Sequence, residues 1–492
     1  MIRSFVQMLV AGVLLVVTVP VQAQLVPIRT VPVASGDQFL TRPSANLGMG
    51  GVHIAVDDSI ADGWGNPAKG AFISESQFIG SPTVYAISNS GGSGKTFPIT
   101  GLFRGERWFG GVSMALQQID ASRNNGNAWI EPWVFWDESS RRLSDVSSEN
   151  LFAAGLVGTE LSGGWSIGLA ASTAHLDAVA GVDLLYAGAE RIDQSGGTGD
   201  IRLGLFRSSA RDELSVTVVH NRISMTHDVH YVDFTWDDDP IQRPVARARI
   251  ESNQDQTRTW GAQVAWARNL TAPGWRVGTT ATVNRKSHPK IPNYSIQNIP
   301  RDPGLTWAYE AGLGLARTKG GTTFGFDVVV QPIWSETWQE ADTPTETAAG
   351  GVLDIGERTI DNDFFFTNVL LRTGINHQSD DVGFQFGLEV RSYAYTLDQT
   401  NHVDVSFRTQ KETWMEWTPT FGGSFELDDL EIRYTARLTT GTGQPGTARS
   451  FSAEERAAFD VGGDFIVAPD APLTLQDANV LTHQLVLRIP IR

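Results

Sequence analysis

Hydrophobic and polar residues alternate strictly along many short segments of this chain. In residues 260–266, Trp, Ala, Val and Trp fall on one face, and Gly, Gln and Ala fall on the other. Residues 324–331, 384–391 and 432–438 repeat the pattern. Because successive side chains of a strand point to opposite faces, this alternation predicts β-strands with one apolar and one polar face.

The polar faces of these strands carry charged side chains, whereas the apolar faces carry Trp and Phe. A soluble sheet would bury its apolar faces in a core. Here the charged residues suit a water-filled lumen and the aromatic residues suit lipid. We therefore predict an all-β fold, a closed antiparallel transmembrane β-barrel, whose lumen-facing polar residues include Asp327, Glu389, Arg391, Arg433 and Arg437.

The predicted strands are joined alternately by short turns and by long polar stretches. Outer-membrane barrels have short turns on the periplasmic side and longer loops outside. The spacing predicts fourteen to sixteen strands within residues 75–492. The short turns fall near 104–106, 160–164, 208–212, 269–274, 318–321, 377–381 and 427–429, and the polar stretches cover about 119–149, 175–197, 225–256, 286–304, 335–361, 398–411 and 442–479.

The N-terminus has the features of a secretory signal. Arg3 precedes an apolar stretch from Met8 to Val19 that is too short for a spanning helix, and Val21-Gln22-Ala23 suits signal cleavage. We expect residues 1–23 to be a signal peptide, the alternative being an anchor that stays attached. An exported barrel of this kind is expected in the bacterial cell outer membrane.

Composition agrees with a barrel and excludes several other classes. The 492 residues include 50 Gly, 15 Trp and 24 Phe, and the mean hydropathy is −0.16. The formal net charge of −17 argues against a nucleic-acid partner, since such an acidic chain repels phosphate backbones. The chain has no Cys, which excludes thiol catalysis and Cys metal sites.

The segment before the barrel is rich in turn-forming residues. Gly48, Gly50 and Gly51 permit positive φ angles, and Asn66-Pro67 marks a fixed bend. This stretch is too interrupted for a strand and too apolar for a free tail. We predict that residues 24–74 form a plug in the barrel mouth; the alternative is a disordered periplasmic arm.

At these residues the sequence resembles the FadL-like superfamily of outer-membrane barrels. The matching features are Leu-Gly-x-Gly-Gly-Val at 47–52, the acidic pair ending in Asp58, Ala61, and Asn-Pro-Ala at 66–68. The superfamily includes long-chain fatty acid and hydrocarbon transporters and the PorV/PorQ-type proteins of type IX secretion. The resemblance implies a hatch motif of Gly48, Gly50, Gly51, Asp58, Asn66, Pro67 and Ala68, with the last three where the hatch meets the first strand. This chain departs from the family pattern at Lys69 and Gly70, and no ligand-binding residue carries over.

Other local patterns do not support catalysis or metal binding. Gly94-Lys95-Thr96 lacks the first Gly of a phosphate loop. His227 and His230 are three apart, which on a strand points them to opposite faces. The acidic run 237–239 lacks a closed ligand set, and the chain has no Gly-x-Ser-x-Gly elbow. We expect no enzyme activity, no cofactor and no metal; the alternative is an esterase or phospholipase with a Ser–His pair in the barrel wall.

The Trp clusters allow two interpretations. Residues 129–136, 334–338 and 414–417 each hold two or three Trp. They can form an aromatic girdle at the membrane interfaces, which is the favoured interpretation, or a landing site for an apolar ligand, for which 129–136 is the better candidate.

The sequence therefore predicts a channel-type protein surrounded by outer-membrane lipids. The first hypothesis is passive uptake of a hydrophobic small molecule resembling a long-chain fatty acid, with rearrangement of the plug. The alternative is a PorV-like barrel that binds exported proteins in type IX-type secretion or attachment.

Overall fold

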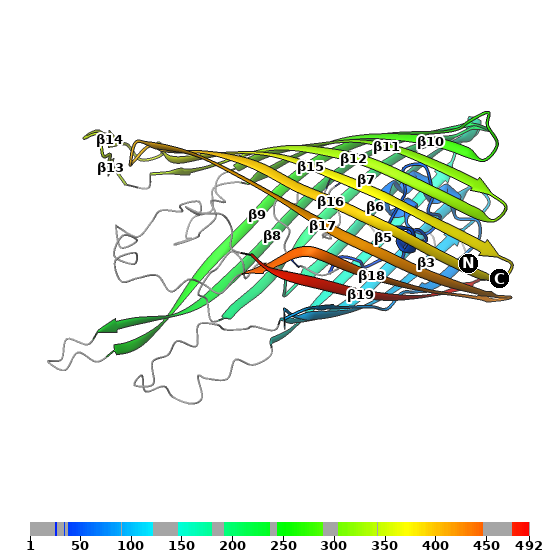
Figure 1. Ribbon diagram of the computed structural model, residues 1–492, viewed down its shortest axis with the longest axis horizontal. Helices are drawn as coiled ribbons and strands as arrows, with labels where there is room; N and C mark the ends of the chain where they lie inside the picture. The colour runs from blue at the N-terminus through cyan, green and yellow to red at the C-terminus, as the bar shows by residue number, and fades with distance from the viewer. Residues whose placement is uncertain are drawn as a thin grey trace, which may run out of the picture.

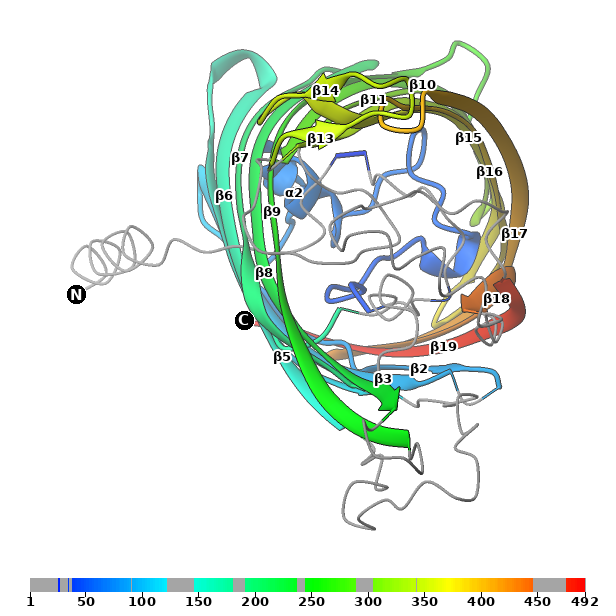
Figure 2. The same ribbon diagram turned by 90° about the vertical axis from the view of Figure 1, so that its left-hand side faces the viewer.

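A computed structural model describes residues 25–26, 34, 38–89, 91–121, 146–179, 191–236, 244–288, 304–341, 343–445 and 475–491. These residues form an antiparallel barrel around an N-terminal segment (Figures 1 and 2). The strands are β1 (Gln77–Gly80), β2 (Thr83–Ile87), β3 (Ser93–Arg104), β4 (Trp108–Ala121), β5 (Val146–Glu160), β6 (Trp165–Leu176), β7 (Arg191–Ser208), β8 (Asp212–Trp236), β9 (Pro244–Asn269), β10 (Trp275–His288), β11 (Gly304–Lys319), β12 (Thr322–Glu340), β15 (Arg358–Ser379), β16 (Val382–Asn401), β17 (Ser406–Leu427), β18 (Leu430–Pro445) and β19 (Leu475–Pro490).

The first wall position is one strand interrupted at Ser81-Pro82. Both β1 and β2 pair with β19 on one side and β3 on the other. Proline cannot donate to the ladder, so it breaks the regular strand. The neighbouring strands still bond the break, because Ser81 N donates to Pro98 O and Leu485 N donates to Pro82 O, each at 3.0 Å. Counting β1 and β2 as one gives sixteen wall positions, within the predicted range.

Each wall position pairs with the next one along the chain, and the first and last positions close the ring. Gln77 of β1 pairs with Pro490 of β19, and Gln77 also pairs with Leu102 of β3. The seven short turns fall where the sequence predicted them, all at the end where β1 begins and β19 ends (Figure 1). By the rule for outer-membrane barrels this is the periplasmic end. The closed antiparallel barrel is confirmed.

The outer face of the wall is apolar and the inner face is largely polar. On β11, the outward Leu313 is 65% exposed, while the inward Gly312 and Gly314 are buried. Buried polar side chains on inward positions include Thr100, Ser113, Gln117, Asn150, Thr280, Thr282, Asn284, Gln331, Asn368, Gln385 and Thr420. Only a lipid environment accommodates an apolar belt of this extent.

The predicted loop at 225–256 is wrong, because most of it is strand. Strands β8 and β9 continue to a pair between Trp236 and Pro244. Strand β7 pairs with β8 only as far as His230, and β10 pairs with β9 only as far as Arg258. Beyond these points the two strands form an isolated hairpin that projects past the wall (Figure 1). Because neither face of this hairpin contacts lipid, its sequence lacks the alternation of apolar and polar residues from which the strands were predicted. The loop at 335–361 contains a small hairpin of β13 (Thr345–Glu346) and β14 (Val352–Leu353).

The N-terminal segment lies inside the barrel. Its described residues hold three short helices, η1 (Leu47–Met49), α2 (Asp62–Gly65) and η2 (Pro67–Phe72). Figure 2 shows this segment, in blue, within the ring of strands. We call its described residues within 25–74 the plug. Among the described residues, no helix is long and apolar enough to cross a membrane. The predicted signal peptide lies outside the described residues.

Candidate functional site: the plugged lumen

The carboxylate of Asp58 organises the plug itself. Asp58 is buried, and its Oδ2 accepts hydrogen bonds from Ser44 Oγ at 2.7 Å and Ala45 N at 2.7 Å. Its Oδ1 accepts from Ile60 N and Ala61 N, both at 3.0 Å. A buried carboxylate bonded by several donors is a strong local organiser. Asp58 therefore connects residues 44–45 of the plug to the residues that begin its α-helical turn.

The glycine turn of the plug docks against β15, β16 and β17. Gly50 and Gly51 have φ of 73° and 72°, a conformation that favours glycine. The Thr420 hydroxyl accepts from Gly50 N at 2.9 Å and donates to Gly48 O at 2.8 Å. A Cβ at Gly50 would run into the backbone of Leu388. These glycines are thus needed both for the backbone turn and for close approach to the wall.

The Asn-Pro-Ala turn docks on the opposite part of the wall, against β6, β7 and β8. Asn66 Nδ2 donates to Ser215 Oγ at 2.7 Å, and Asn66 Oδ1 accepts from Ala68 N at 3.0 Å. Ala68 O accepts from Ser166 Oγ at 2.9 Å. Pro67 is the first residue of η2, where its missing N–H costs nothing. Strand β1 begins only a few residues later, at Gln77.

Two arginines of the wall also bind the plug, one beside the Asn-Pro-Ala turn and one on β10. Arg276 of β10 donates to both carboxylate oxygens of Asp57 and to Glu213 Oε2 at 2.6 Å. Arg202 of β7 donates to the carbonyl oxygens of Trp64 at 3.1 Å and Gly65 at 3.0 Å. The plug is therefore bonded to the wall on several sides of the lumen.

The predicted lumen-facing residues on β12 and β16 form part of this interface. Asp327 is fully buried, and its Oδ2 accepts from His53 N at 2.8 Å. Glu389 accepts from Arg372 Nε at 2.8 Å and lies 3.3 Å from Arg391. Asp327 thus contacts the plug directly, while Glu389 and Arg391 form an ion-pair group on the wall beside it.

The two predicted arginines of β18 also lie at inward positions. Arg433 pairs with Glu431 on the same strand, and Arg437 interacts electrostatically with Glu389. Their part in transport stays a prediction.

Charged groups of the plug are perturbed by burial. Burial raises the pKa of Asp62, against the lowering effect of Lys69, whose Nζ lies 2.9 Å from Asp62 Oδ2. Burial opposes the charge of Lys69, but the nearby carboxylates of Asp62, Asp57 and Glu213 together raise the Lys69 pKa. Burial and the neighbouring positive charge of Arg202 lower the pKa of Arg42 to about 10, although Asp200 opposes this. Arg42 stacks over Trp64 at 4.6 Å from the ring centroid.

A set of inward wall glycines makes room for the plug. A Cβ on Gly204 would meet the Asn66 side chain, and one on Gly168 would meet the backbone of Pro67. On the other side, a Cβ on Gly374 or Gly387 would meet the backbone of Met49. These glycines were not predicted from the sequence. Their signal was glycine at inward positions of otherwise regular strands, which indicates a close backbone approach.

The inner wall also carries an aromatic patch farther from the short turns. Four rings form it, and we call them the lumenal aromatic cluster: Phe364, Phe366, Tyr395 and Trp414. Phe366 and Tyr395 have ring centroids 5.6 Å apart, and Tyr395 and Trp414 have centroids 5.8 Å apart. Ala308, Ile333 and Leu397 pack with them. This patch of the inner wall is therefore mainly apolar, in contrast to the buried polar side chains around it.

Apolar residues of the plug occupy three such patches. Val26 is fully buried in the lumenal aromatic cluster, and its carbonyl accepts from Asn284 Nδ2 at 3.1 Å. Ala34 packs with Tyr85 and residues of β2 and β19. Phe39 packs against a patch on β4–β8 that includes Phe152. The N-terminal part of the chain thus covers the apolar areas of the lumen.

The Trp clusters divide between the two faces of the wall. Trp334 and Trp417 face outward and are 48% and 45% exposed, as an aromatic girdle requires. Trp414 instead faces the lumen, where it packs with the lumenal aromatic cluster. The predicted landing site at 129–136 lies outside the described residues.

The remaining candidate motifs lie on strands or outside the described part. His227 is buried on β8 and His230 lies on the opposite parity, 3.0 Å from Asp193. Residues 94–96 belong to β3. The acidic run 237–239 lies outside the described residues. Within the described residues, no three His, Asp or Glu side chains are placed to hold a metal ion.

Comparisons with known proteins return only solved structures; no family model and no curated protein matches. A FadL homologue of Pseudomonas aeruginosa is 10% identical, with 92% of this chain and 99% of that chain covered and a TM-score of 0.44. The toluene transporters TbuX of Ralstonia pickettii and TodX of Pseudomonas putida are each 10% identical with a TM-score of 0.40. The alignments cover 92% of this chain and 100% of TbuX, and 91% of this chain and 97% of TodX.

At this level of identity and superposition, the function of this chain has to come from its own residues. The closed wall of sixteen strand positions and its apolar exterior define the class: the protein is a bacterial outer-membrane β-barrel.

Proposed function

We propose that the barrel takes up hydrophobic small molecules passively, and that displacement of the plug opens their path. The ligand class is a long-chain fatty acid or a similar molecule with an extended apolar part. No covalent step is involved, and no cofactor is needed.

The lumenal aromatic cluster is the observation that carries this proposal. Four clustered rings on the inner wall of a water-filled pore would be unfavourable, since aromatic area exposed to water costs free energy. The chain covers this area with its own Val26. A ligand with an apolar chain can replace Val26 on the same rings. When the apolar chain of the ligand replaces Val26, the buried apolar area stays nearly unchanged. Ligand binding is therefore coupled to displacement of the N-terminal part of the plug.

Binding of a fluorescent fatty acid to the full barrel in detergent tests the proposal. We expect saturable binding that the double variant Phe366→Ala and Trp414→Ala weakens by at least about tenfold, given the usual contribution of buried aromatic contacts. The matched control is Phe386→Ala and Phe421→Ala, an aromatic pair on the lipid-facing side with centroids 5.2 Å apart. Equal binding by both double variants would exclude the lumenal site.

Uptake into liposomes tests the transport step. The control pair should leave the rate of fatty acid entry unchanged, and the lumenal pair should reduce it. Binding of exported proteins, the alternative expected from the sequence, would use the long loops, most of whose residues lie outside the described part. Capture of an exported protein without any fatty acid binding would favour that alternative.

A further inference from the structure

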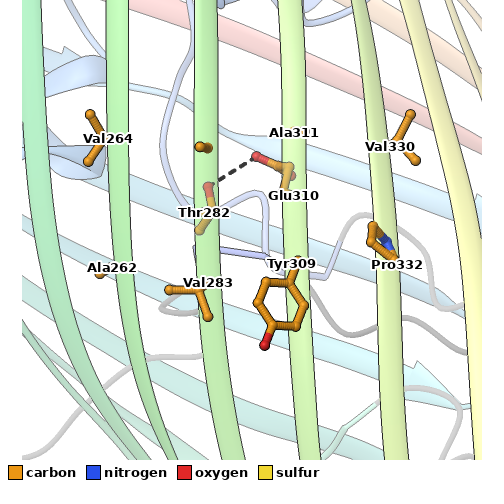
Figure 3. A pocket seen from close by; sticks show the side chains of 10 residues that line it. Ala262, Val264, Thr282, Val283, Tyr309, Glu310, Ala311, Val330 and Pro332 are labelled. Atoms are coloured by element: carbon orange, nitrogen blue, oxygen red, sulfur yellow. Dashed lines mark hydrogen bonds between the residues drawn. The ribbon is translucent and has the colours of Figure 1, made fainter.

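The lipid-facing side of the wall has an apolar groove across β9, β10, β11 and β12. The groove has a volume of about 470 Å³, and Figure 3 shows the side chains that line it. Ala262, Ala281 and Ala311 provide small outward side chains in it, and Val330 and Pro332 lie on its β12 side.

Proline explains why the wall is hollowed at this place. The pairing of β11 with β12 passes from Ala308 opposite Ile333 to Ala311 opposite Val330, and it skips the two positions between. One skipped position is Pro332, which has no N–H to donate. The ladder therefore opens locally, and the groove is a fixed feature of the backbone.

A row of aromatic residues borders the groove on the side of the long loops. Trp307 and Tyr309 stack with centroids 6.3 Å apart, and Tyr309 meets Trp334 edge-on at 5.5 Å. On β9, Trp260 is 56% exposed and stacks on His220 at 4.1 Å. Such a row marks a membrane–water interface.

Three outward arginines lie next to this row. Arg285 follows Val283 of the groove along β10, and its guanidinium lies 5.9 Å from the Trp307 ring centroid. Arg258 lies two residues beyond Trp260 on β9, and Arg222 of β8 pairs directly opposite Arg258 in the ladder. Within the described residues, neither Arg222 nor Arg258 has an ion pair with a carboxylate. Two positive charges that face each other without a counter-ion favour an anion from outside the chain.

The height of the arginines matches a lipid headgroup. On β10 the outward residues run from Trp275 at the short turn to Arg285. Ten residues at about 3.3 Å each span roughly 33 Å along the strand, and a tilt of about 35–45° reduces this to about 25 Å across the membrane. That is about the height of the apolar band of such barrels. The arginines therefore lie at the outer edge of the hydrocarbon layer, directly beyond the groove.

We propose that this face binds an anionic lipid of the outer leaflet. The phosphate of the lipid contacts Arg222, Arg258 and Arg285, and one of its acyl chains lies in the groove over the three alanines. The site is separate from the lumen and independent of transport.

Native mass spectrometry of the full barrel in a mild detergent tests this site. The probes are dipalmitoyl phosphatidic acid, dipalmitoyl phosphatidylcholine with the same chains, and inorganic phosphate alone. We expect retention of phosphatidic acid above phosphatidylcholine. At about 1 kcal/mol per arginine, or roughly fivefold each, the variant R222Q/R258Q/R285Q should bind it about a hundredfold more weakly. The matched control R207Q/R268Q/R317Q removes three outward arginines near the short turns and should bind like the wild type.

A second pair of variants tests the groove without changing charge. A281F/A311F fills the groove and should reduce phosphatidic acid binding, whereas A153F/A171F, on the lipid-facing side of β5 and β6, should not. If the glutamine variant fails to assemble, R222K/R258K/R285K keeps the charge and should retain binding. Wild-type binding by A281F/A311F, equal retention of phosphatidylcholine, or displacement of the lipid by equimolar inorganic phosphate would overturn the proposal.

Discussion

Replacement of Asn66 by alanine should release the plug from one side of the wall while leaving the barrel closed. The Asn66 amide connects the plug to β7 and β8 through Ser215 Oγ and through the carbonyls of Leu205 and Val216, at 2.7, 3.3 and 3.2 Å. Within the plug it accepts from Ala68 N at 3.0 Å. All of these bonds disappear in Asn66→Ala.

The free-energy change follows from the groups left without a partner. The two carbonyls belong to strands, so they lose only an additional hydrogen bond. The Ser215 hydroxyl and the Ala68 N–H each lose a buried partner, at about 1–3 kcal/mol each. A total of about 2–6 kcal/mol weakens docking of this turn by roughly 30- to 20,000-fold, since 1.4 kcal/mol corresponds to a factor of ten.

Hydrogen exchange followed by mass spectrometry measures this docking. Peptides from residues 62–72 should lose protection in Asn66→Ala, while peptides from β16 and β17 should keep it. In liposomes, the same variant should take up a fatty acid faster. The control is Asn362→Ala, which removes another buried amide, one bonded to Gln399 on the wall and away from the plug. Unchanged protection of residues 62–72 in a heat-stable Asn66→Ala barrel would refute the assigned role of this turn.

Three further changes test the plug interface. Gly204→Ala should displace the Asn66 turn, because the added Cβ meets the Asn66 side chain. Hydrogen exchange in residues 62–72 should therefore rise. The control Gly80→Ala, which has open space around its Cβ, should have no effect. Asp58→Asn should destabilise the folded plug by about 3 kcal/mol, because an amide nitrogen cannot accept the hydrogen bonds that one carboxylate oxygen accepts. Hydrogen exchange in residues 44–61 should become faster while the barrel stays intact. Native protection of these residues would contradict the prediction. Arg276→Gln should weaken the contact with Asp57 and Glu213. In the wild type, 1 M salt should increase hydrogen exchange in the plug, and in the variant it should have no effect. An equal salt response in both proteins would argue against these ion pairs.

The wall of the barrel was predictable because lipid imposes a regular pattern on it. Every strand that crosses the apolar layer alternates, and the seven short turns separate the strands clearly. The β8–β9 hairpin was missed for the same physical reason: beyond Arg258 nothing requires one face to be apolar. The break at Ser81-Pro82 could not be told from a turn without knowing that both pieces share the same neighbours.

The lumen was less predictable, since its contacts join residues far apart in the chain. The Gly and Asn-Pro-Ala motifs indicated that the N-terminal segment has a defined conformation. Nothing in the sequence showed that Asn66 meets Ser215 or that Gly50 meets Thr420. Trp414 appeared to be a girdle residue, but a single residue offset in β17 decides between lipid and lumen. The glycines of the wall could have indicated where the plug approaches it. They are informative only once it is known which alternate residues of each strand face the lumen.

The position of the plug at the start of the chain constrains the order in which the protein assembles. The plug precedes β1, yet it contacts strands around the whole wall as far as β19, and the wall closes only when β19 pairs with β1. Contacts of such large sequence separation form late, because the loops that they close carry a large entropy cost. The N-terminal segment must therefore wait, without its final partners, until nearly the whole chain has been exported. Closure of the last strand then encloses it, so a slow final phase that protects residues 44–72 and β19 together is built into this topology.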